Sequence, residues 1–153
     1  MKIIEIKKDL FKEPFNNESD VYAHCISQDF AMGAGIAKTF SEKFPQLVSN
    51  KNKMIEEYKN NNPYKRIYVA DCNGTKIVNL VTKQKYWMKP TITNLDLSLW
   101  NLRKFIEDNS NIKRILMPRI GSGLDRLEWK EVKTAILENL EGLDIEVKVF
   151  YLK

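Results

Sequence analysis

Two glycine-rich segments are the residues of this chain whose types and spacing most directly indicate chemistry. Gly33-Ala34-Gly35 and Gly121-Ser122-Gly123 each stand between a run of β-forming residues and a helical pattern. At such a junction, backbone N–H groups and the helix dipole can bind a phosphate, and glycine lets the main chain approach the anion closely. One such loop can be an ordinary tight turn, but two at the carboxyl ends of parallel strands can meet on a single diphosphate.

Neither loop completes one of the common nucleotide-binding motifs. Neither is followed by Gly-Lys-Ser/Thr, which disfavours a Walker-type NTPase. Neither extends to Gly-x-Gly-x-x-Gly, which disfavours a dinucleotide-binding site. The two loops therefore indicate a nucleotide ligand without identifying it.

The elements that must position these loops follow from the spacing of apolar residues. Alternating or continuous apolar runs predict strands, and apolar residues three or four apart predict helices. The Asn73-Gly74 pair is typical of a hairpin between two antiparallel strands. Strands are predicted at 2–6, 21–26, 66–70, 76–81, 114–117 and 146–152, and helices at 36–44, 47–59, 94–107 with Thr93 as its N-cap, and 127–140.

The alternation of strands and helices predicts one α/β domain over residues 1–153. We expect a six-stranded, mixed and mainly parallel sheet with helices on both faces, which gives three layers in the order α/β/α. With 43% apolar residues in 153, the composition is sufficient for one hydrophobic core. We find no internal repeat and no boundary of a second domain.

Cysteine content and charge limit the other function classes. Cys25, Cys72 and the single histidine, His24, are too few for a disulfide framework or a three-ligand zinc site, so no metal or cofactor is expected. His24 and Cys25 are interpreted as structural residues of a buried strand. The net charge of +5 comes from lysines interleaved with acidic residues, which favours a solvated surface and leaves a polyanionic partner open.

No segment has the pattern of a signal peptide, and no apolar run approaches the roughly 20 residues of a membrane span. We therefore expect a cytoplasmic protein that does not bind membranes, and a monomer.

Four motifs, taken in order along the chain, are more specific than either glycine loop. Together they resemble the motifs of macrodomains, in particular the class of lysine-dependent terminal ADP-ribose glycohydrolases, and the likeness spans nearly the whole chain. The motifs are Lys8-Asp9-Leu10-Phe11, then His24-Cys25-Ile26-Ser27 with Met32-Gly33-Ala34-Gly35-Ile36-Ala37, then Thr82-Lys83, and finally Pro118-Arg119-Ile120-Gly121-Ser122-Gly123-Leu124-Asp125.

The resemblance implies a function and a partner. Members of this class remove ADP-ribose from acidic protein side chains, and relatives in bacterial toxin–antitoxin systems remove it from thymidine in DNA. The expected substrate is therefore ADP-ribose attached to a protein or a nucleic acid, and the carrier stays open. The segment Gln84–Met88 shows the least likeness, so it says nothing about the carrier.

The resemblance also implies which residues bind ADP-ribose. Asp9, Leu10 and Leu152 would bind the adenine end, and Ser27, Met32 and Gly33 would line the middle of the ligand. The residues that would surround the diphosphate and the distal ribose are Arg119, Ile120, Gly121, Ser122, Gly123, Leu124 and Asp125.

Lys83 is the catalytic nucleophile that the resemblance implies. The distal ribose is a masked aldehyde, so a neutral lysine amine can attack its anomeric carbon and form a covalent lysyl–sugar adduct that water resolves. Lysine is normally charged near pH 7, and desolvation in a closed cleft is what would favour the neutral form. Without the resemblance, Lys83 would be interpreted as one more solvated charge.

Asp125 has two compatible interpretations. The segment Asp125-Arg126-Leu127-Glu128 has the spacing of a capping box in front of a helix. The resemblance implies that Asp125 is also a catalytic acid/base, which exchanges a proton with the leaving group or with a Schiff-base intermediate.

The three tryptophans are predicted to differ in role. Trp100 and Trp129 fall on predicted helices and are interpreted as packing residues. Trp87 follows Lys83 in a loop between Lys85 and Lys89, where it could stack on a nucleobase if the carrier is DNA or RNA.

Two other functions stay open on the sequence. A non-catalytic macrodomain reader would bind ADP-ribose and would need the glycine loops but neither Lys83 nor Asp125. A lysine-rich nucleic-acid-binding domain, in which the glycine loops are only turns, would bind a polyanion with an affinity that falls steeply as salt rises.

Overall fold

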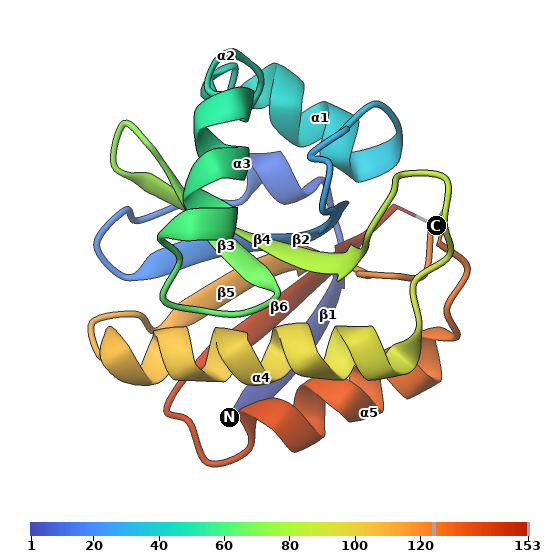
Figure 1. Cartoon of the computed structure of the whole chain (residues 1–153). Coiled ribbons are helices and arrows are strands. Elements are labelled where there is room, and N and C mark those ends of the chain that lie inside the picture. The colour runs from blue at the N-terminus through green and yellow to red at the C-terminus, as the bar shows by residue number, and fades with distance from the viewer. Residues whose placement is uncertain (124, 153) are drawn as a thin grey trace.

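Six strands form one mixed sheet in a computed structural model of the chain, which describes residues 1–123 and 125–152 (Figure 1). The strands are β1 (Lys2–Lys7), β2 (Asp20–Ser27), β3 (Ile67–Cys72), β4 (Thr75–Lys83), β5 (Arg114–Pro118) and β6 (Glu146–Tyr151). The helices are the 3-10 helix η1 (Leu10–Lys12) and the α-helices α1 (Gly35–Lys43), α2 (Gln46–Ser49), α3 (Lys51–Asn60), α4 (Ile92–Asp108) and α5 (Trp129–Leu140).

The strand order is β1-β6-β5-β2-β4-β3. The β3–β4 pair is antiparallel, and the other four neighbouring pairs are parallel. The expectation of a six-stranded, mainly parallel sheet is thereby confirmed. Because the first five strands in this order all run the same way, the carboxyl ends of β2, β4 and β5 meet at one edge, and the loops that follow them lie together there.

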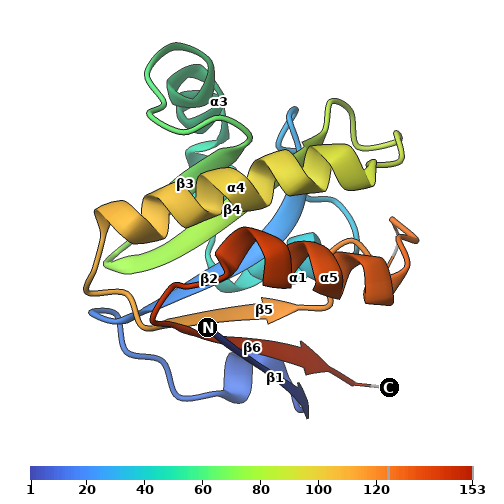
Figure 2. The same ribbon diagram turned by 90° about the horizontal axis from the view of Figure 1, so that it is seen from below.

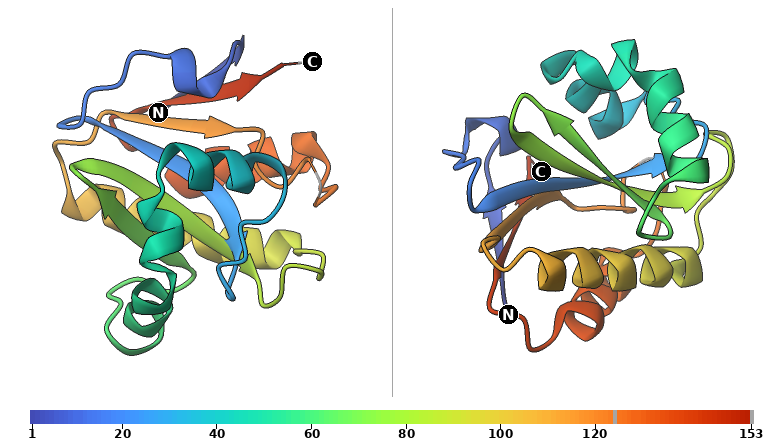
Figure 3. Two further views of the ribbon diagram at one scale, coloured as in Figure 1. Left: turned by 90° about the horizontal axis from the view of Figure 1, so that it is seen from above. Right: turned by 60° about the vertical axis from the view of Figure 1, so that its left-hand side comes forward.

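Helices cover both faces of the sheet. Figure 1 and the right-hand view of Figure 3 show α1, α2 and α3 on one face and α4 and α5 on the other. Figure 2 shows α4 and α5 side by side across the second face. The predicted three-layer α/β/α architecture is therefore confirmed.

The apolar run of strand β2 is continuous rather than alternating because both faces of the strand are buried. Its side chains point alternately to the two faces, and each face has its own core. Val21 and Ala23 belong to the core beneath α4 and α5, while Tyr22 and Ile26 belong to the core beneath α1 and α3. Because β2 is buried on both faces, its position is fixed by packing. The residue that follows its carboxyl end is therefore held in place as well.

The predicted hairpin is confirmed. Cys72 pairs with Thr75, and the two residues between them, Asn73 and Gly74, have φ angles of +54° and +92°. Positive φ at both central positions is the geometry for which Asn-Gly is favoured.

The predicted helices differ from the structure in where they begin and in one break. Helix α4 begins at Ile92, and the side chain of Thr91 rather than Thr93 caps it by accepting a hydrogen bond from the Asn94 N–H at 3.1 Å. Both threonines suit an N-cap. The backbone is extended at Thr91 and helical from Ile92, so Thr91 takes the N-cap position. The single helix predicted for residues 47–59 is two helices, α2 and α3, separated at Asn50.

The capping-box interpretation of Asp125 is wrong. Helix α5 begins at Trp129, and its N-cap position is Glu128, which makes no side-chain capping bond. The chain after Asp125 instead bonds to the second glycine loop, with the Leu127 N–H donating to the Gly121 carbonyl at 2.7 Å. Asp125 therefore lies in the loop and not at the helix.

His24 is a structural residue, as predicted. Its ring is fully buried, stacks on Phe40 at 4.2 Å between centroids, and its Nε2 is 2.7 Å from Asn79 Oδ1. Burial lowers the pKa of His24 to about 4, so the ring is neutral at physiological pH.

The prediction that the helical tryptophans are packing residues holds for one of them. Trp129 packs against the core beneath α5 and donates from its Nε1 to Glu5 at 2.8 Å. Trp100 is 47% exposed, so the prediction is wrong there. The apolar stripe of α4 faces the sheet, and Trp100 lies outside it.

Candidate functional site

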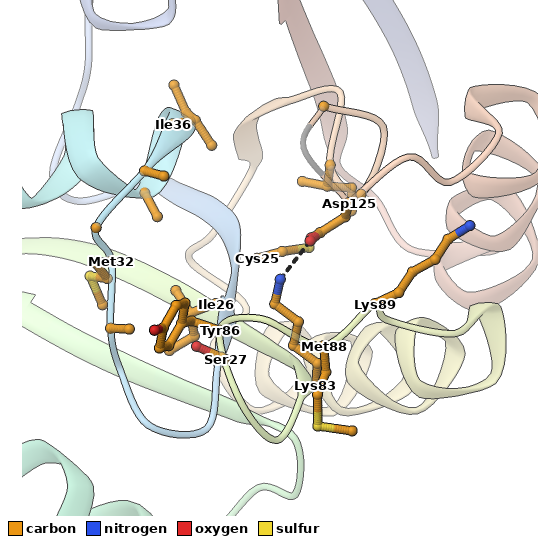
Figure 4. Close-up of a pocket in the computed structure, with 18 of the residues that line it drawn as sticks. Cys25, Ile26, Ser27, Met32, Ile36, Lys83, Tyr86, Met88, Lys89 and Asp125 are labelled. Carbon is orange, nitrogen blue, oxygen red and sulfur yellow. Dashed lines mark hydrogen bonds and ion pairs between the residues drawn. The ribbon is translucent and has the colours of Figure 1, made fainter.

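A cavity of about 910 Å³ opens where β2, β4 and β5 end (Figure 4). Its volume is in the range of roughly 300–1,000 Å³ that is usual for small-molecule sites. The three segments that follow these strands line it, and most of the lining is apolar or backbone. The lining residues are Cys25, Ile26, Ser27, Ala31, Met32, Gly33, Ala34, Gly35, Ile36, Ala37, Lys83, Tyr86, Trp87, Met88, Lys89, Pro118, Arg119, Ile120, Gly121, Gly123, Asp125 and Arg126.

Lys83 and Asp125 form an ion pair inside this cavity. Lys83 Nζ donates to Asp125 Oδ1 at 2.6 Å, drawn as a dashed line in Figure 4. The two side chains are 14% and 18% exposed, although 42 positions separate them in the sequence. Lys83 ends β4, and Asp125 lies in the loop after β5, so the sheet brings them together.

The register of the sheet fixes the base of Lys83. Ser27, the last residue of β2, pairs with Lys83, and the Gln28 N–H donates to the Lys83 carbonyl at 2.8 Å. The register shifts between Ile26 and Ser27, which marks a local irregularity at the edge of the cavity. Such irregularities re-aim side chains next to binding sites.

The first glycine loop leads into α1 at the cavity wall. Gly35, the first residue of α1, has a φ of +61°, and Met32 has a φ of +30°, which is unusual for a residue with a side chain. The N-cap, Ala34, makes no side-chain capping bond. Among residues 1–123 and 125–152, no side chain accepts from the first N–H groups of α1 at the cavity, which is the arrangement that binds an anion.

The second glycine loop closes on itself through the main chain. The Ser122 N–H donates to the Arg119 carbonyl, and the Arg126 N–H donates to the Gly123 carbonyl, both at 3.2 Å. Gly121 has a φ of +70°, and a Cβ there would lie 3.0 Å from Leu127 Cδ1. The positive φ favours glycine at this position, and an added Cβ would also make the end of the Leu127 side chain shift.

Arg119 directs its guanidinium away from the centre of the cavity. Its Cζ lies 4.0 Å from the ring centroid of Tyr151 and 5.8 Å from that of Trp129, and its Nη2 lies 3.5 Å from Glu5 Oε1. These contacts are cation–π and ionic contacts to the last strand, to α5 and to β1. The side chain of Arg119 therefore anchors the second glycine loop to the sheet.

A second, shallower cavity of about 560 Å³ lies on the other side of this loop. Arg119, Ser122 and Gly123 line it together with Tyr151 and Trp129. Ser122, predicted at the diphosphate, therefore lines this second cavity. Its Oγ is buried and has no hydrogen-bond partner among the residues that the structure describes.

Asp29, which the sequence reasoning missed, is not among the lining residues but bonds to three that are. It accepts hydrogen bonds from the Ser27 hydroxyl, from the Ala31 N–H at 3.3 Å and from the Tyr86 N–H at 3.3 Å. Burial raises the pKa of this carboxyl, but the hydrogen bonds from Ser27, Tyr86 and Ala31 outweigh it, and the pKa is lowered. An aspartate that bonds the N–H two residues onward is an Asx turn, which is a signal that the sequence carries.

Three predicted residues lie elsewhere. Asp9 caps η1 by accepting from the Phe11 N–H at 3.0 Å, and Leu10 is 4% exposed in the core beneath α1. Leu152 follows β6 and is 68% exposed. None of these three is among the described residues that line either cavity. Leu124 lies outside the described residues.

Cys25 lines the cavity as a neutral thiol. Burial first, and the Asp125 charge second, raise its pKa to about 12. A thiol with so high a pKa is a poor nucleophile at neutral pH. Lys83 and Asp125 are thus the groups of the cavity that suit covalent and acid/base chemistry.

Over residues 1–123 and 125–152, no group of three or more His, Cys, Asp or Glu side chains is arranged to hold a metal ion. Over the same residues, no helix is both long and apolar enough to span a membrane.

Comparison with known proteins agrees with this geometry. Residues 23–136 match the family model of the Macro domain. The ADP-ribose glycohydrolase OARD1 of Homo sapiens is 39% identical over 153 residues, which cover 99% of this chain and 92% of that protein. A DNA ADP-ribosyl glycohydrolase of Thermus aquaticus is 32% identical over 125 residues, which cover 78% of this chain and 34% of that protein.

A solved structure is similar over almost the same extent. The macrodomain of Thermus aquaticus DarG superposes with a TM-score of 0.80 and 25% sequence identity, and the match covers 97% of each chain. The resemblance drawn from the four motifs is therefore confirmed.

Proposed function

Because the chain belongs to the Macro domain family, we propose that it is an ADP-ribosyl glycohydrolase in which Lys83 and Asp125 carry out the reaction. The protein removes ADP-ribose from a modified carrier, either an acidic protein side chain or a nucleobase. The names of two relatives support this activity: an ADP-ribose glycohydrolase is 39% identical, and a DNA ADP-ribosyl glycohydrolase is 32% identical.

The contact between Lys83 Nζ and Asp125 Oδ1 at 2.6 Å is the observation that carries the proposal. A protein that only binds ADP-ribose needs the glycine loops but has no use for a lysine and a carboxylate in the same cavity. Both charged side chains are less than one-fifth exposed, and removing them from water is unfavourable. Binding of ADP-ribose alone does not require this arrangement. A lysine whose proton has a nearby acceptor is suited to act as a nucleophile.

The ligand is proposed to lie along the carboxyl edge of the sheet. The N–H groups at the start of α1 and the main chain of the second glycine loop bind the diphosphate. The residues around it are Ser27, Met32, Gly33, Arg119, Ile120, Gly121, Gly123 and Asp125. The adenine end extends toward Asp9, Leu10 and Leu152. Support for that direction comes from the Lys8 N–H, which donates to the Tyr151 carbonyl at 3.0 Å, so both chain segments leave the sheet at the same edge.

The proposed reaction begins when Lys83 transfers a proton to the Asp125 carboxylate and the neutral Nζ attacks the anomeric carbon of the distal ribose. The bond from that carbon to the carrier breaks, and the leaving atom takes a proton that Asp125 delivers. The glycosylamine opens to a Schiff base, with the ring oxygen becoming a hydroxyl. Water then adds to the anomeric carbon, the bond to Nζ breaks, ADP-ribose is released with the water oxygen on that carbon, and free Lys83 is regenerated.

Two measurements test the proposal. One is the release of ADP-ribose from a glutamate-modified peptide and from an oligonucleotide with an ADP-ribosylated thymidine, compared at equal ligand occupancy. The other is borohydride trapping with free ADP-ribose, followed by peptide mass mapping. Release and the trapped adduct should both disappear in Lys83→Ala and persist in Lys59→Ala, which removes an exposed lysine near the end of α3.

Three results would contradict the proposal. Release that persists in Lys83→Ala would exclude the lysine mechanism. An adduct mapped to other lysines would do the same. If the unaltered protein bound ADP-ribose but cleaved neither substrate, it would be a non-catalytic reader.

A further inference from the structure

We infer that Asp29 is a positioning residue for Lys83: its carboxylate ties the turn that follows Lys83 to the loop that follows β2, and so fixes where Lys83 Nζ lies in the cavity. The inference rests on the proposed glycohydrolase function, because the placement of Nζ matters to the reaction only if Nζ attacks the ligand. Asp29 is not among the residues that line the cavity, so it acts through the segments that it holds.

The carboxylate of Asp29 bridges two segments that are far apart in the sequence. Its Oδ1 accepts from the Ser27 hydroxyl and from the Ala31 N–H, the latter at 3.3 Å. Its Oδ2 accepts from the Tyr86 N–H at 3.3 Å, 57 positions further along the chain. In Figure 4, Ser27 and Tyr86 lie next to each other, in agreement with their shared partner.

The bond to Tyr86 is not part of the local turn that Asp29 forms. An Asx turn uses one carboxylate oxygen, which here accepts from the Ala31 N–H two residues onward. The other oxygen accepts from a segment that follows a different strand. The shaping of its own loop therefore accounts for Oδ1 of Asp29 but not for Oδ2.

The loop after β2 is the rigid partner in this contact. Phe30, the residue after Asp29, is 2% exposed, and its ring packs against Tyr58 and Tyr68 at 6.0 and 5.8 Å between centroids. Phe30 has a φ of +57°, which is unusual for a residue with a side chain, so packing must hold the backbone there. The buried ring of Phe30 thus anchors the backbone beside Asp29.

The backbone of Lys83 is held mainly from one side. The ladder between β3 and β4 ends at the pair of Ile67 and Leu80, before Lys83 is reached. Among the described residues, Lys83 pairs with β2 alone, through Ser27 and through the Gln28 N–H, which donates to the Lys83 carbonyl at 2.8 Å. The direction of this strand end therefore depends also on the turn that follows it.

Packing contributes little to holding that turn. Tyr86 is 66% exposed and Trp87 is 71% exposed. Over residues 1–123 and 125–152, the bond from the Tyr86 N–H to Asp29 is the one hydrogen bond that joins residues 84–89 to another segment. Loss of this bond frees the turn and, with it, the side of the strand end that β2 does not hold.

The placement of Nζ is what the proposed reaction requires. Lys83 Nζ lies 2.6 Å from Asp125 Oδ1, and both the proton transfer and the attack depend on this arrangement. A displacement of about 1 Å at a reacting group can lower a rate about 10²-fold. The glycine loops, and not Asp29, provide the binding groups for the diphosphate. Loss of the Asp29 contact should therefore slow the reaction more than it weakens binding.

Asp29→Asn tests the contact from the acceptor side. Asparagine also forms Asx turns, so its oxygen can keep the bond from the Ala31 N–H, and its amide nitrogen, which is a donor, then faces the Tyr86 N–H. We expect kcat for ADP-ribose release, and the rate of borohydride trapping, to fall about 10- to 100-fold, while the Kd for free ADP-ribose in calorimetry stays within about threefold.

Asp71→Asn is the matched control. Asp71 also accepts from a backbone N–H, that of Gly74 at 2.7 Å, but in the exposed hairpin at the opposite end of β4. The same chemical change there should leave kcat unchanged.

A second pair of variants removes the donor instead of the acceptor. The Met88 N–H donates to the Lys85 carbonyl at 3.0 Å, so Tyr86 is at the first central position of the turn, where proline is favoured. Tyr86→Pro deletes the N–H, and Tyr86→Ala loses the same ring but keeps the N–H. We expect kcat to be about 10- to 100-fold lower in Tyr86→Pro than in Tyr86→Ala.

Three results would overturn the inference. The first is an unchanged kcat in Asp29→Asn. The second is a Kd that weakens as much as kcat falls, which would show a binding role. The third is an equal kcat in the two Tyr86 variants, which would show that Asp29 acts through its own loop alone.

Failure of the glycohydrolase proposal is recognised separately, because the unaltered protein would then trap no adduct on Lys83. Hydrogen exchange of the peptide over residues 84–89, followed by mass spectrometry, still tests the contact in that case. Exchange should be faster in Asp29→Asn than in the unaltered protein, and equal exchange would refute the contact.

Discussion

Replacing Glu13 by Gln is expected to destabilise the protein strongly at neutral pH and much less in acid. Glu13, whose side chain is 7% exposed, accepts from three cations: Lys8 Nζ at 2.7 Å, Arg114 Nη1 at 2.9 Å and Lys148 Nζ at 2.6 Å. Arg114 also binds Asp20, at 2.7 Å from Nη2 to Oδ2. This cluster joins the segment after η1 to β5, β6 and the start of β2, so it ties the amino-terminal part of the chain to the sheet.

The magnitude follows from the pKa of the carboxyl. The hydrogen bonds from Lys148 and then Lys8, opposed by burial and assisted by Arg114, lower the pKa of Glu13 from 4.5 to about 2. Such a difference between the folded and unfolded chain is worth about 3 kcal/mol at neutral pH. This is an upper value, because the three cations are 34%, 25% and 20% exposed and water screens them.

The sign of the pH dependence follows from the direction of the shift. A carboxyl with a lowered pKa in the folded state contributes its stability above pH 4.5, and the contribution is lost as the pH falls toward about 2. At pH 3, about 2 of the 3 kcal/mol should be gone. The difference in stability between the unaltered protein and Glu13→Gln should therefore shrink by about that amount between pH 7 and pH 3.

Urea unfolding followed by circular dichroism at both pH values measures this difference. Taking the difference between two proteins cancels the titration of the other carboxyls. Glu18→Gln, at an exposed position, is the matched control and should change stability by less than about 0.5 kcal/mol at either pH. A Glu13→Gln effect of the same size at pH 7 and pH 3 would refute the reasoning.

Three further predictions concern the site. Asp125→Asn should lower kcat by about 10²- to 10⁴-fold in the ADP-ribose release assay while leaving ADP-ribose affinity, measured by calorimetry, within about threefold; full turnover would exclude its acid/base role. Gly121→Ala, at a φ of +70°, should cost about 1–2 kcal/mol in urea unfolding, and Gly123→Ala, where an added Cβ meets nothing within 4 Å, should cost far less. Equal losses in the two would contradict the conformational argument. Because burial raises the pKa of Cys25 to about 12, its alkylation by iodoacetamide at pH 7.5 should be about 10²-fold or more slower in the folded than in the unfolded protein, as mass mapping can show.

The sequence by itself determined the elements and their type. Apolar spacing placed all six strands, Asn73-Gly74 placed the hairpin, and two glycine loops pointed to a phosphate-binding edge. These properties are local, since a period of two or of three to four residues and a preference for positive φ depend only on neighbours in the chain. The resemblance of four motifs then identified the family, which the family match confirmed.

The sequence determined the ends of the helices less well than their presence, because several residues near a helix end can serve as its N-cap. Thr91 and Thr93 both suit an N-cap, and Asp125 has the spacing of a capping box, yet α4 begins at Ile92 and α5 at Trp129. The path by which the chain reaches each helix decides which residue caps it, and that path is set by packing against the sheet.

Only the tertiary structure decided which side chains that are far apart in the sequence lie close together. The 2.6 Å contact between Lys83 and Asp125 depends on the order β5-β2-β4 and on the register that pairs Ser27 with Lys83. The guanidinium of Arg119, expected at the diphosphate, binds Tyr151 because β5 and β6 are neighbours and their ends coincide. The spacing of residues along a chain gives their period and direction, but the distance between residues far apart in sequence is set by strand order and register, which many sequence positions determine together.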